Sequence, residues 1–407
     1  MGAISIIWVN QATVLNKCRK KAKISTDSID VSIYSTYPIM ANFDPEQPYN
    51  DLPLLPPSGE IETKVVLKAC IEARAAVAEL KQCGELIPNQ AMLINTIPVL
   101  EAQASSAIEN IVTTADRLFQ FANSPDAQID AATKEALRYG KALYSGFESL
   151  STRPLTKQTA IEVCSTIKGV DMQIRRVPGT TLMEANSGRV IYTPPSGEVI
   201  LQEKLTNWEK FIHEAIEFDP LVRLAVMHYQ FEAIHPFIDG NGRTGRILNI
   251  LFLVDLDLLE IPVLYLSRYI IQHKQNYYDY LNRIATEGDW ESWILFMLDA
   301  IRETAQWTTQ KIRSIRQLME VTTEYVKETR PKVYDRDLLD LIFVQPYCRI
   351  ANVVDAEIAH RQTAANYLKK LCEIGVLKET KVGREKLFIH PRFLELLTAE
   401  NHNVIPY

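Results

Sequence analysis

His235-Pro-Phe-Ile-Asp-Gly-Asn-Gly-Arg-Thr-Gly-Arg246 is the stretch that governs the fold prediction, because it sets polar residues between two strongly apolar segments. Upstream, apolar residues between Leu221 and Tyr229 recur at the spacing of a helix face. Downstream, Ile247 to Leu259 is almost wholly apolar, which is typical of a buried helix. The polar stretch is therefore predicted to be a loop held between two core helices.

The glycines and arginines of this loop suit phosphate binding. Gly240 and Gly242 allow the backbone to approach a ligand closely and to adopt conformations that other residues avoid. Successive N–H groups there, at the start of the helix that continues through Ile247, would form an anion-binding nest. Arg243 and Arg246 lie three residues apart, so they share a helix face and could grip adjacent phosphates.

Two further side chains supply the groups that phosphate transfer needs. Asp239 is placed to hold Mg²⁺ against the phosphates. His235 could take a proton from an attacking hydroxyl group near neutral pH. The alternative is a polar helix–helix turn with a solvated basic end, which Gly-Asn-Gly alone would favour. The combination of histidine, aspartate, Gly-Asn-Gly and paired arginines argues against that alternative.

The same stretch resembles the Fic motif, H-x-F-x-D/E-G-N-G-R-x-x-R, at every specified position. Fic proteins are mostly AMP transferases, which move AMP from ATP to a protein hydroxyl group and release pyrophosphate. The resemblance implies that His235 is the general base, Asp239 the Mg²⁺ ligand, and Asn241 with the neighbouring amides the phosphate anion hole. Phe237 would pack beneath the loop.

The resemblance also extends to the residues that hold ATP. It implies that Arg243 and Arg246 bind the triphosphate tail. The expected ATP-binding run is Gly240, Asn241, Gly242, Arg243, Thr244, Gly245 and Arg246.

A second motif lies in Ser105-Ser-Ala-Ile-Glu109-Asn110. From the residues alone, Ser106 and Glu109 predict a capping box at a helix start. Beside a Fic motif, the stretch also resembles the family's inhibitory motif, S/T-x-x-x-E-G/N, through Ser105, Glu109 and Asn110. That resemblance implies that Glu109 pairs with Arg246 and holds it away from the γ-phosphate of ATP. It implies a second role for the same carboxylate, which can orient water for removal of AMP from a modified protein.

Residues 175–198 change in character, because glycines and prolines interrupt short β-branched runs. A hairpin and an ordinary connecting loop both fit this composition. Fic proteins carry a hairpin flap here that clamps the target protein by strand addition. Its counterpart would be Arg189, Val190, Ile191 and Tyr192, which would also line the ATP side. By the same resemblance, Tyr277 would face the adenosine.

The chain beyond Pro331 has three short helical patterns and then an alternating pattern from Leu377 to Ile389, which resembles a winged helix-turn-helix. Between His360 and Lys386 the basic residues exceed the acidic ones by four, seven against three. The third helix would present Arg361, Thr363, Asn366, Lys369 and Lys370. DNA binding and protein or dimer docking both remain open for this domain, and we also expect a homodimer.

Length and composition fit a globular chain of two or three domains, with 407 residues of which 47% are hydrophobic. The net charge of -6 gives no overall indication of binding to nucleic acid or membrane. Six scattered cysteines without a CxxC pair fit thiols in a reducing compartment. No apolar run has transmembrane length and no signal peptide is recognised. The sequence predicts a cytoplasmic protein without a membrane partner.

The predicted fold class is mainly α: a Fic helical core with a small β-hairpin flap, followed by a winged helix-turn-helix domain. The expected divisions are an N-terminal tail (1–49) that need not be ordered, a helical segment with the inhibitory motif (50–150), the catalytic core (151–300), a linker helix (301–330) and the winged helix domain (331–407).

The predicted function is transfer of AMP from ATP to a Ser, Thr or Tyr hydroxyl group of a target protein and of the chain itself, with ATP as substrate and Mg²⁺ as cofactor. Three alternatives remain. The same site could act as a de-AMPylase or in both directions, or could transfer another phosphate-containing group. The chain could also be a DNA-binding regulator whose Fic core senses a nucleotide.

Overall fold

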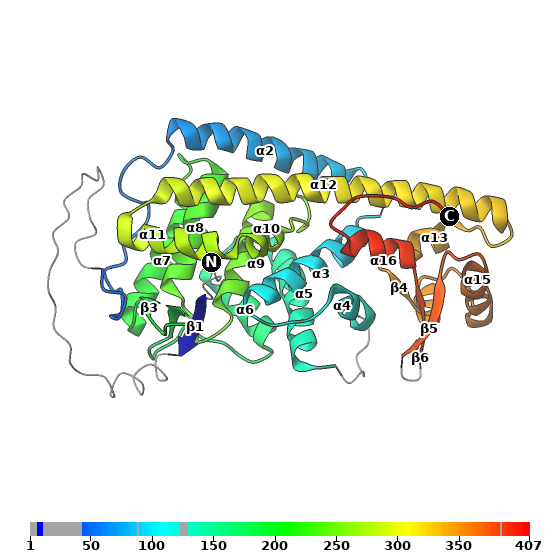
Figure 1. Cartoon of the computed structure of the whole chain (residues 1–407), viewed down its shortest axis with the longest axis horizontal. Helices are drawn as coiled ribbons and strands as arrows, with labels where there is room; N and C mark the ends of the chain where they lie inside the picture. The colour runs from blue at the N-terminus through cyan, green and yellow to red at the C-terminus, as the bar shows by residue number, and fades with distance from the viewer. Residues whose placement is uncertain (1–5, 11–42, 88, 123–128, 185, 383–384) are drawn as a thin grey trace.

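The structure, a computed structural model, describes residues 6–10, 43–87, 89–122, 129–184, 186–382 and 385–407. The predicted tail, 1–49, lies mostly outside the described residues. The described part is mainly helical, as predicted, with two small antiparallel sheets (Figure 1). Among the described residues, no helix combines the length and the apolarity that crossing a membrane requires.

Two long helices, α2 (Lys64–Glu85) and α12 (Trp290–Thr329), lie side by side along the long axis of the molecule (Figure 1). α2 begins at Thr63, whose hydroxyl group accepts the backbone N–H of Val66 at 3.3 Å and so caps the helix. α12 continues through residues 300 and 301 without a break, so the predicted division between core and linker helix coincides with no interruption of the helix.

The remaining helices between α2 and α12 complete the core. In chain order they are α3 (Ala91–Ile108), α4 (Ala115–Phe121), α5 (Ala131–Leu150), α6 (Lys157–Lys168), α7 (Glu198–Glu214), α8 (Pro220–Ile234), α9 (Asn241–Asp255), α10 (Leu266–Gln272) and α11 (Lys274–Glu287). The loop lies between α8 and α9, which are the two apolar helices that the sequence predicts on its two sides.

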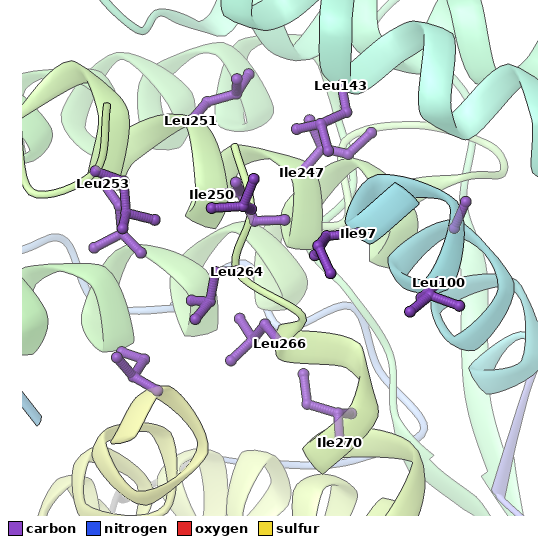
Figure 2. Packing of buried hydrophobic residues seen from close by; sticks show 14 of the residues in the cluster. Ile97, Leu100, Leu143, Ile247, Ile250, Leu251, Leu253, Leu264, Leu266 and Ile270 are labelled. Atoms are coloured by element: carbon purple, nitrogen blue, oxygen red, sulfur yellow. The ribbon is translucent and has the colours of Figure 1, made fainter. Parts of the chain in front are cut away.

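The core packs directly against the helix that follows the loop. Ile247, Ile250 and Leu251 of α9 lie among side chains of α3, α5 and α10 (Figure 2). Burial of each large aliphatic side chain contributes roughly 1.5–3 kcal/mol. The motif loop therefore begins and ends on helices whose positions the core fixes.

The predicted hairpin is present as β2 (Thr180–Glu184) and β3 (Val190–Tyr192). The strands are antiparallel, with Leu182 opposite Tyr192. A third strand, β1 (Ile6–Asn10), pairs antiparallel with the other side of β2, giving the order β1-β2-β3. Sequence analysis assigned this stretch to the tail and did not predict its pairing.

The predicted capping box at Ser106 and Glu109 is wrong, because a helix ends there and does not begin. α3 closes at Ile108, Glu109 is its C-cap, and Asn110 has a left-handed backbone with a φ of 61°. The N–H groups of Glu109 and Asn110 donate to the carbonyl oxygens of Ser106 and Ala107 at 3.1 and 3.0 Å. An S-x-x-E spacing can therefore close a helix as well as open one.

The C-terminal region has the element order predicted for a winged helix. It contains α13 (Arg336–Ile342), β4 (Tyr347–Cys348), α14 (Ile350–Asp355), α15 (Arg361–Glu373), β5 (Lys378–Val382), β6 (Glu385–Ile389) and α16 (Pro391–Thr398), with sheet order β4-β6-β5. Lys311 of α12 donates to the carbonyl oxygens of Leu396, Ala399 and Asn401 at 2.6–2.8 Å, which joins α16 to the long helix.

Candidate active site

His235 is the C-cap of α8 and has a left-handed backbone with a φ of 49°. The buried guanidinium of Arg175 holds this conformation, because its Nε donates to the His235 carbonyl oxygen at 2.8 Å. Nδ1 of His235 lies 3.3 Å from the carbonyl oxygen of Glu232. A carbonyl oxygen can only accept, so this contact assigns the hydrogen to Nδ1 and the basic lone pair to Nε2.

The imidazole of His235 is neutral at physiological pH. Burial, and then the positive charge of Arg175, lowers the pKa of His235 to about 3. A general base must be unprotonated before it accepts a proton, and His235 satisfies this condition.

The Asn241 side chain hydrogen-bonds to the backbone of its own loop. Its Nδ2 donates to the carbonyl oxygen of Phe237 and its Oδ1 accepts the Phe237 N–H, both at 2.8 Å. Phe237 is buried beneath the loop. The Asn241 side chain is therefore committed to loop geometry, which leaves anion binding to the backbone N–H groups at the start of α9. Gly240, the N-cap, has a φ of 87°, which favours glycine.

The structure brings Arg246 and the predicted inhibitory segment together. Nη2 of Arg246 lies 2.8 Å from Oε1 of Glu109 and 2.9 Å from the carbonyl oxygen of Ser105, and Nε lies 2.8 Å from Ser105 Oγ. Burial alone would lower the pKa of Arg246, but the charge of Glu109 raises it overall. Lys274 steadies the next turn, since its Nζ donates to the carbonyl oxygen of Ile108 at 2.6 Å and contacts Asn110 Oδ1 at 3.4 Å.

Arg243 has a carboxylate partner that sequence analysis missed. Its Nη1 lies 2.6 Å from Oε1 of Glu135, on α5, and its Nη2 lies 3.5 Å from Oδ1 of Asp239. Lys168, at the end of α6, contacts both Glu135 and Asp239. No local pattern in the sequence marks Glu135 or Lys168, because only the packing of α5 and α6 against α9 brings them to the loop.

A cavity of about 470 Å³ opens over the loop. Its lining includes eight predicted residues: Glu109, Asn110, His235, Asp239, Gly240, Asn241, Gly242 and Arg243. It also includes residues that were not predicted, among them Glu135, Lys168, Thr180 and Tyr278. The base, the carboxylates, the arginine and the helix N-terminus thus share one space.

Thr244, Gly245 and Arg246 lie behind this surface and do not line the cavity. Thr244 is fully buried, and its N–H donates to the Gly240 carbonyl oxygen at 3.0 Å. A Cβ atom on Gly245 would collide with Glu232 and press on Phe231, so this glycine permits close packing of α9 on α8.

The flap residues lie at a neighbouring cavity. Arg189, Val190 and Ile191 line a separate space of about 350 Å³. Tyr192 is buried, and its hydroxyl group donates to the Ala233 carbonyl oxygen at 2.9 Å. The predicted flap therefore adjoins the loop cavity and does not line it.

The structure also departs from the prediction for Tyr277. This side chain is buried, with its hydroxyl group 2.9 Å from Nε2 of His228 and its ring packed on Trp293 at 5.6 Å. Consecutive residues of a helix point about 100° apart, so only one of two adjacent tyrosines can face the cavity. Tyr278 takes that place and lines both cavities.

Asp239 fits the chemistry of a magnesium ligand. Its side chain is 59% exposed and lines the cavity. No group of three His, Cys, Asp or Glu residues that could enclose a metal exists within the described ranges. Mg²⁺ commonly binds through one or two carboxylates, with substrate phosphates and water as its other ligands. A single exposed aspartate beside a phosphate-binding helix N-terminus fits that mode.

Comparisons with known proteins match three parts of the chain. Residues 67–148 match the Fic/DOC family N-terminal model, residues 154–253 match the Fic/DOC family model, and residues 318–393 match the C-terminal domain model of SoFic-like protein adenylyltransferases.

Curated relatives and a solved structure agree with these matches. "Protein adenylyltransferase Fic" of Aedes aegypti and that of Culex quinquefasciatus are each 32% identical over 123 residues, which is 29% of this chain and 23% of the relative. The match thus spans less than a quarter of these relatives. The crystal structure of a Fic family protein from Desulfovibrio desulfuricans G20 shares the fold, with a TM-score of 0.54 at 17% identity, covering 82% of this chain and 98% of that one.

Proposed function

Since the chain carries a Fic/DOC domain between a Fic/DOC N-terminal domain and a SoFic-like C-terminal domain, we propose that it is a protein adenylyltransferase. It moves AMP from ATP to a Ser, Thr or Tyr hydroxyl group of a protein. One observation carries the proposal: a neutral His235, the N-terminus of α9, Arg243 and Asp239 line a single cavity.

The reaction follows from this arrangement. The N–H groups at the start of α9 bind the phosphates of ATP. The target hydroxyl oxygen attacks the α-phosphorus, the bond to pyrophosphate breaks, and Nε2 of His235 takes the hydroxyl proton. Mg²⁺, when bound at Asp239, neutralises charge on the departing pyrophosphate. Positioning and charge stabilisation supply most of the rate enhancement.

We further propose that the chain is autoinhibited. Arg246 is 1% exposed and its guanidinium is engaged by Glu109 and Ser105. An arginine held in this way cannot also reach the γ-phosphate, so ATP binds in a pose that is not aligned for attack. Release of Glu109 is then the step that activates transfer.

De-AMPylation is the second candidate activity. Glu109 lines the cavity and keeps 22% of its side chain exposed, which would allow its carboxylate to orient a water molecule. Release of AMP from a pre-modified target by the wild type, but not by the Glu109→Gly variant, would assign this activity.

We also propose binding surfaces for two partners, a target protein and DNA. β3 is one of the two edge strands of its sheet, and an edge strand offers unpaired main-chain groups to a target segment. The exposed face of α15, with Arg361, Thr363 and Lys369, would suit DNA phosphates. A homodimer and a cytoplasmic location stay predictions from the sequence.

Mass spectrometry of the purified Glu109→Gly variant after incubation with ATP and Mg²⁺ tests the proposed function. We expect the chain to carry covalently bound AMP, and the Glu109→Gly/His235→Ala double variant to carry none. The mass of the adduct separates AMP from phosphate or phosphocholine. Salt-sensitive DNA binding without any adduct would favour the alternative of a nucleotide-sensing regulator.

A further inference from the structure

The carboxylate proposed to hold Mg²⁺ already has a cation beside it. Nζ of Lys168 lies 2.6 Å from Oδ2 of Asp239. The position of this lysine is fixed at its backbone, because α6 ends there on Gly169, in the left-handed conformation, and Arg138 Nη1 donates to the Lys168 carbonyl oxygen at 3.0 Å. The ammonium group thus lies against Oδ2, one of the two Asp239 oxygens that could bind a metal, at the cavity wall.

The same ammonium group has a second carboxylate partner. Nζ lies 2.8 Å from Oε1 of Glu135, the atom that also accepts Arg243 Nη1 at 2.6 Å. Arg243 Nη2 returns to Asp239 at 3.5 Å. The two carboxylates and the two cationic side chains therefore form a closed ring of contacts with no net formal charge.

The ring is buried on one side and open on the other. The side chain of Arg243 is 2% exposed, those of Lys168 and Glu135 are 20% and 21% exposed, and that of Asp239 is 59% exposed. Lysine carries a compact charge on a flexible four-carbon stem. Lys168 is therefore the cation of the ring that can move, while the packed guanidinium of Arg243 stays in place.

We propose that Lys168 is a built-in counter-cation of Asp239 that a divalent metal ion displaces, and that Glu135 is the carboxylate to which the ammonium group withdraws. The inference deepens the proposed function and rests on it. Mg²⁺ needs a carboxylate oxygen at about 2.0–2.1 Å. The ammonium group at 2.6 Å competes for that oxygen, and two adjacent cations repel each other.

Glu135 makes the exchange possible. Because Lys168 already contacts Glu135, the ammonium group can leave Asp239 and remain paired with a carboxylate. The lysine thereby sets the Mg²⁺ concentration at which the site accepts a metal–nucleotide complex.

The rival role for Lys168 is that of a direct phosphate ligand, and the two roles make opposite predictions. If Lys168 competes with Mg²⁺, its removal lowers the Mg²⁺ concentration that nucleotide binding requires. Loss of a phosphate ligand weakens nucleotide binding with and without the metal.

The test is calorimetric titration of the full chain with a non-hydrolysable ATP analogue over a series of Mg²⁺ concentrations. Lys168→Met is expected to lower the Mg²⁺ midpoint of analogue binding about tenfold, an effect smaller than a full charge–charge contact at a partly exposed site. Glu135→Gln is expected to raise that midpoint, because Lys168 then has only Asp239 as its carboxylate partner. Lys134→Gln, which removes an exposed charge next to Glu135, is the matched control and should leave the midpoint unchanged.

The two substitutions in the ring must move the midpoint in opposite directions. Weaker analogue binding by Lys168→Met without a lower midpoint would overturn the proposal in favour of a phosphate ligand. A shift of both variants in the same direction would assign Lys168 and Glu135 a purely structural role. Lys168→Gln serves as a second variant, and circular dichroism verifies that each variant is folded.

The failure of the proposed function would look different. In that case the Glu109→Gly variant carries no AMP adduct, whether or not the analogue binds. If neither the wild type nor any variant binds the analogue at any Mg²⁺ concentration, this inference falls as well. Analogue binding with an unchanged midpoint in Lys168→Met overturns the inference alone.

Discussion

The two arginines of the motif helix are held in different ways, although they lie one turn apart on α9. Arg246 is paired with one carboxylate, Glu109, and with Ser105. Arg243 belongs to a ring in which Glu135 is shared with Lys168 and Asp239. On one side of the loop the arginine has one carboxylate partner, whereas on the other side an arginine and a lysine share two carboxylates.

The backbones that carry the two glutamates explain the difference. Glu109 is the C-cap of α3, where the chain leaves the helix through the left-handed Asn110. Glu135 lies inside α5, so helical hydrogen bonds hold its backbone on both sides. We therefore expect the Glu109 side to respond to movement of a chain segment, and the Glu135 side to respond to metal and nucleotide.

The largest expected effect comes from removing His235, the proposed general base. His235→Ala in the Glu109→Gly background should lower the rate of AMP incorporation by a factor of roughly 10²–10⁴, because general base catalysis contributes that much. Binding of the ATP analogue should persist, since the phosphate contacts remain. An unchanged rate of incorporation would mean that another group takes the proton.

A direct comparison of the two glutamates sharpens the contrast. At saturating Mg²⁺, Glu109→Gln should raise the affinity for the ATP analogue by about tenfold, equal to about 1.4 kcal/mol, because Arg246 is freed for the γ-phosphate. Glu135→Gln should raise it less, because Arg243 keeps its contact with Asp239. Calorimetry measures both values, and an equal or larger gain for Glu135→Gln would remove the proposed distinction.

The last expected effect is on stability, not on activity, and concerns acid conditions on the Arg246 side. Burial, and then the charge of Arg246, lowers the pKa of His228 to about 3, so the unfolded chain binds a proton there before the folded chain does. The contribution of His228 to stability is therefore complete above the unfolded pKa of about 6.5 and is lost as the pH falls from there towards 3.

Denaturant titrations at several pH values measure this contribution. Relative to His228→Asn, the wild type should lose about 1.4 kcal/mol of unfolding free energy per pH unit below pH ~6.5. Parallel pH profiles for the wild type and His228→Asn would contradict the burial of a neutral imidazole at this site.

Sequence patterns predicted the features that are continuous along the chain. The apolar runs before and after the motif predicted α8 and α9. The interrupted β-branched runs fitted a hairpin and a connecting loop equally, and the family resemblance pointed to the hairpin β2–β3. The association of Glu109 with Arg246 came from a family resemblance, since no local pattern joins residues 137 positions apart.

The remaining features depend on tertiary packing. Glu135 and Lys168 reach the loop only because α5 and α6 pack beside α9. Helical periodicity could not decide which of Tyr277 and Tyr278 faces the cavity, because both are buried aromatic residues of α11. The S-x-x-E pattern gave the wrong end of α3, because the helix already extends from Ala91 and buries Ser106 within its last turn.

The most direct test of the central claim is the rate of self-AMPylation in four proteins: the wild type, Glu109→Gly, Arg246→Ala and the double variant. If Glu109 inhibits by holding Arg246, Glu109→Gly raises the rate at least about tenfold when Arg246 is present and gives no gain when Arg246 is absent. An equal gain in both backgrounds, or no gain in either, would contradict the claim.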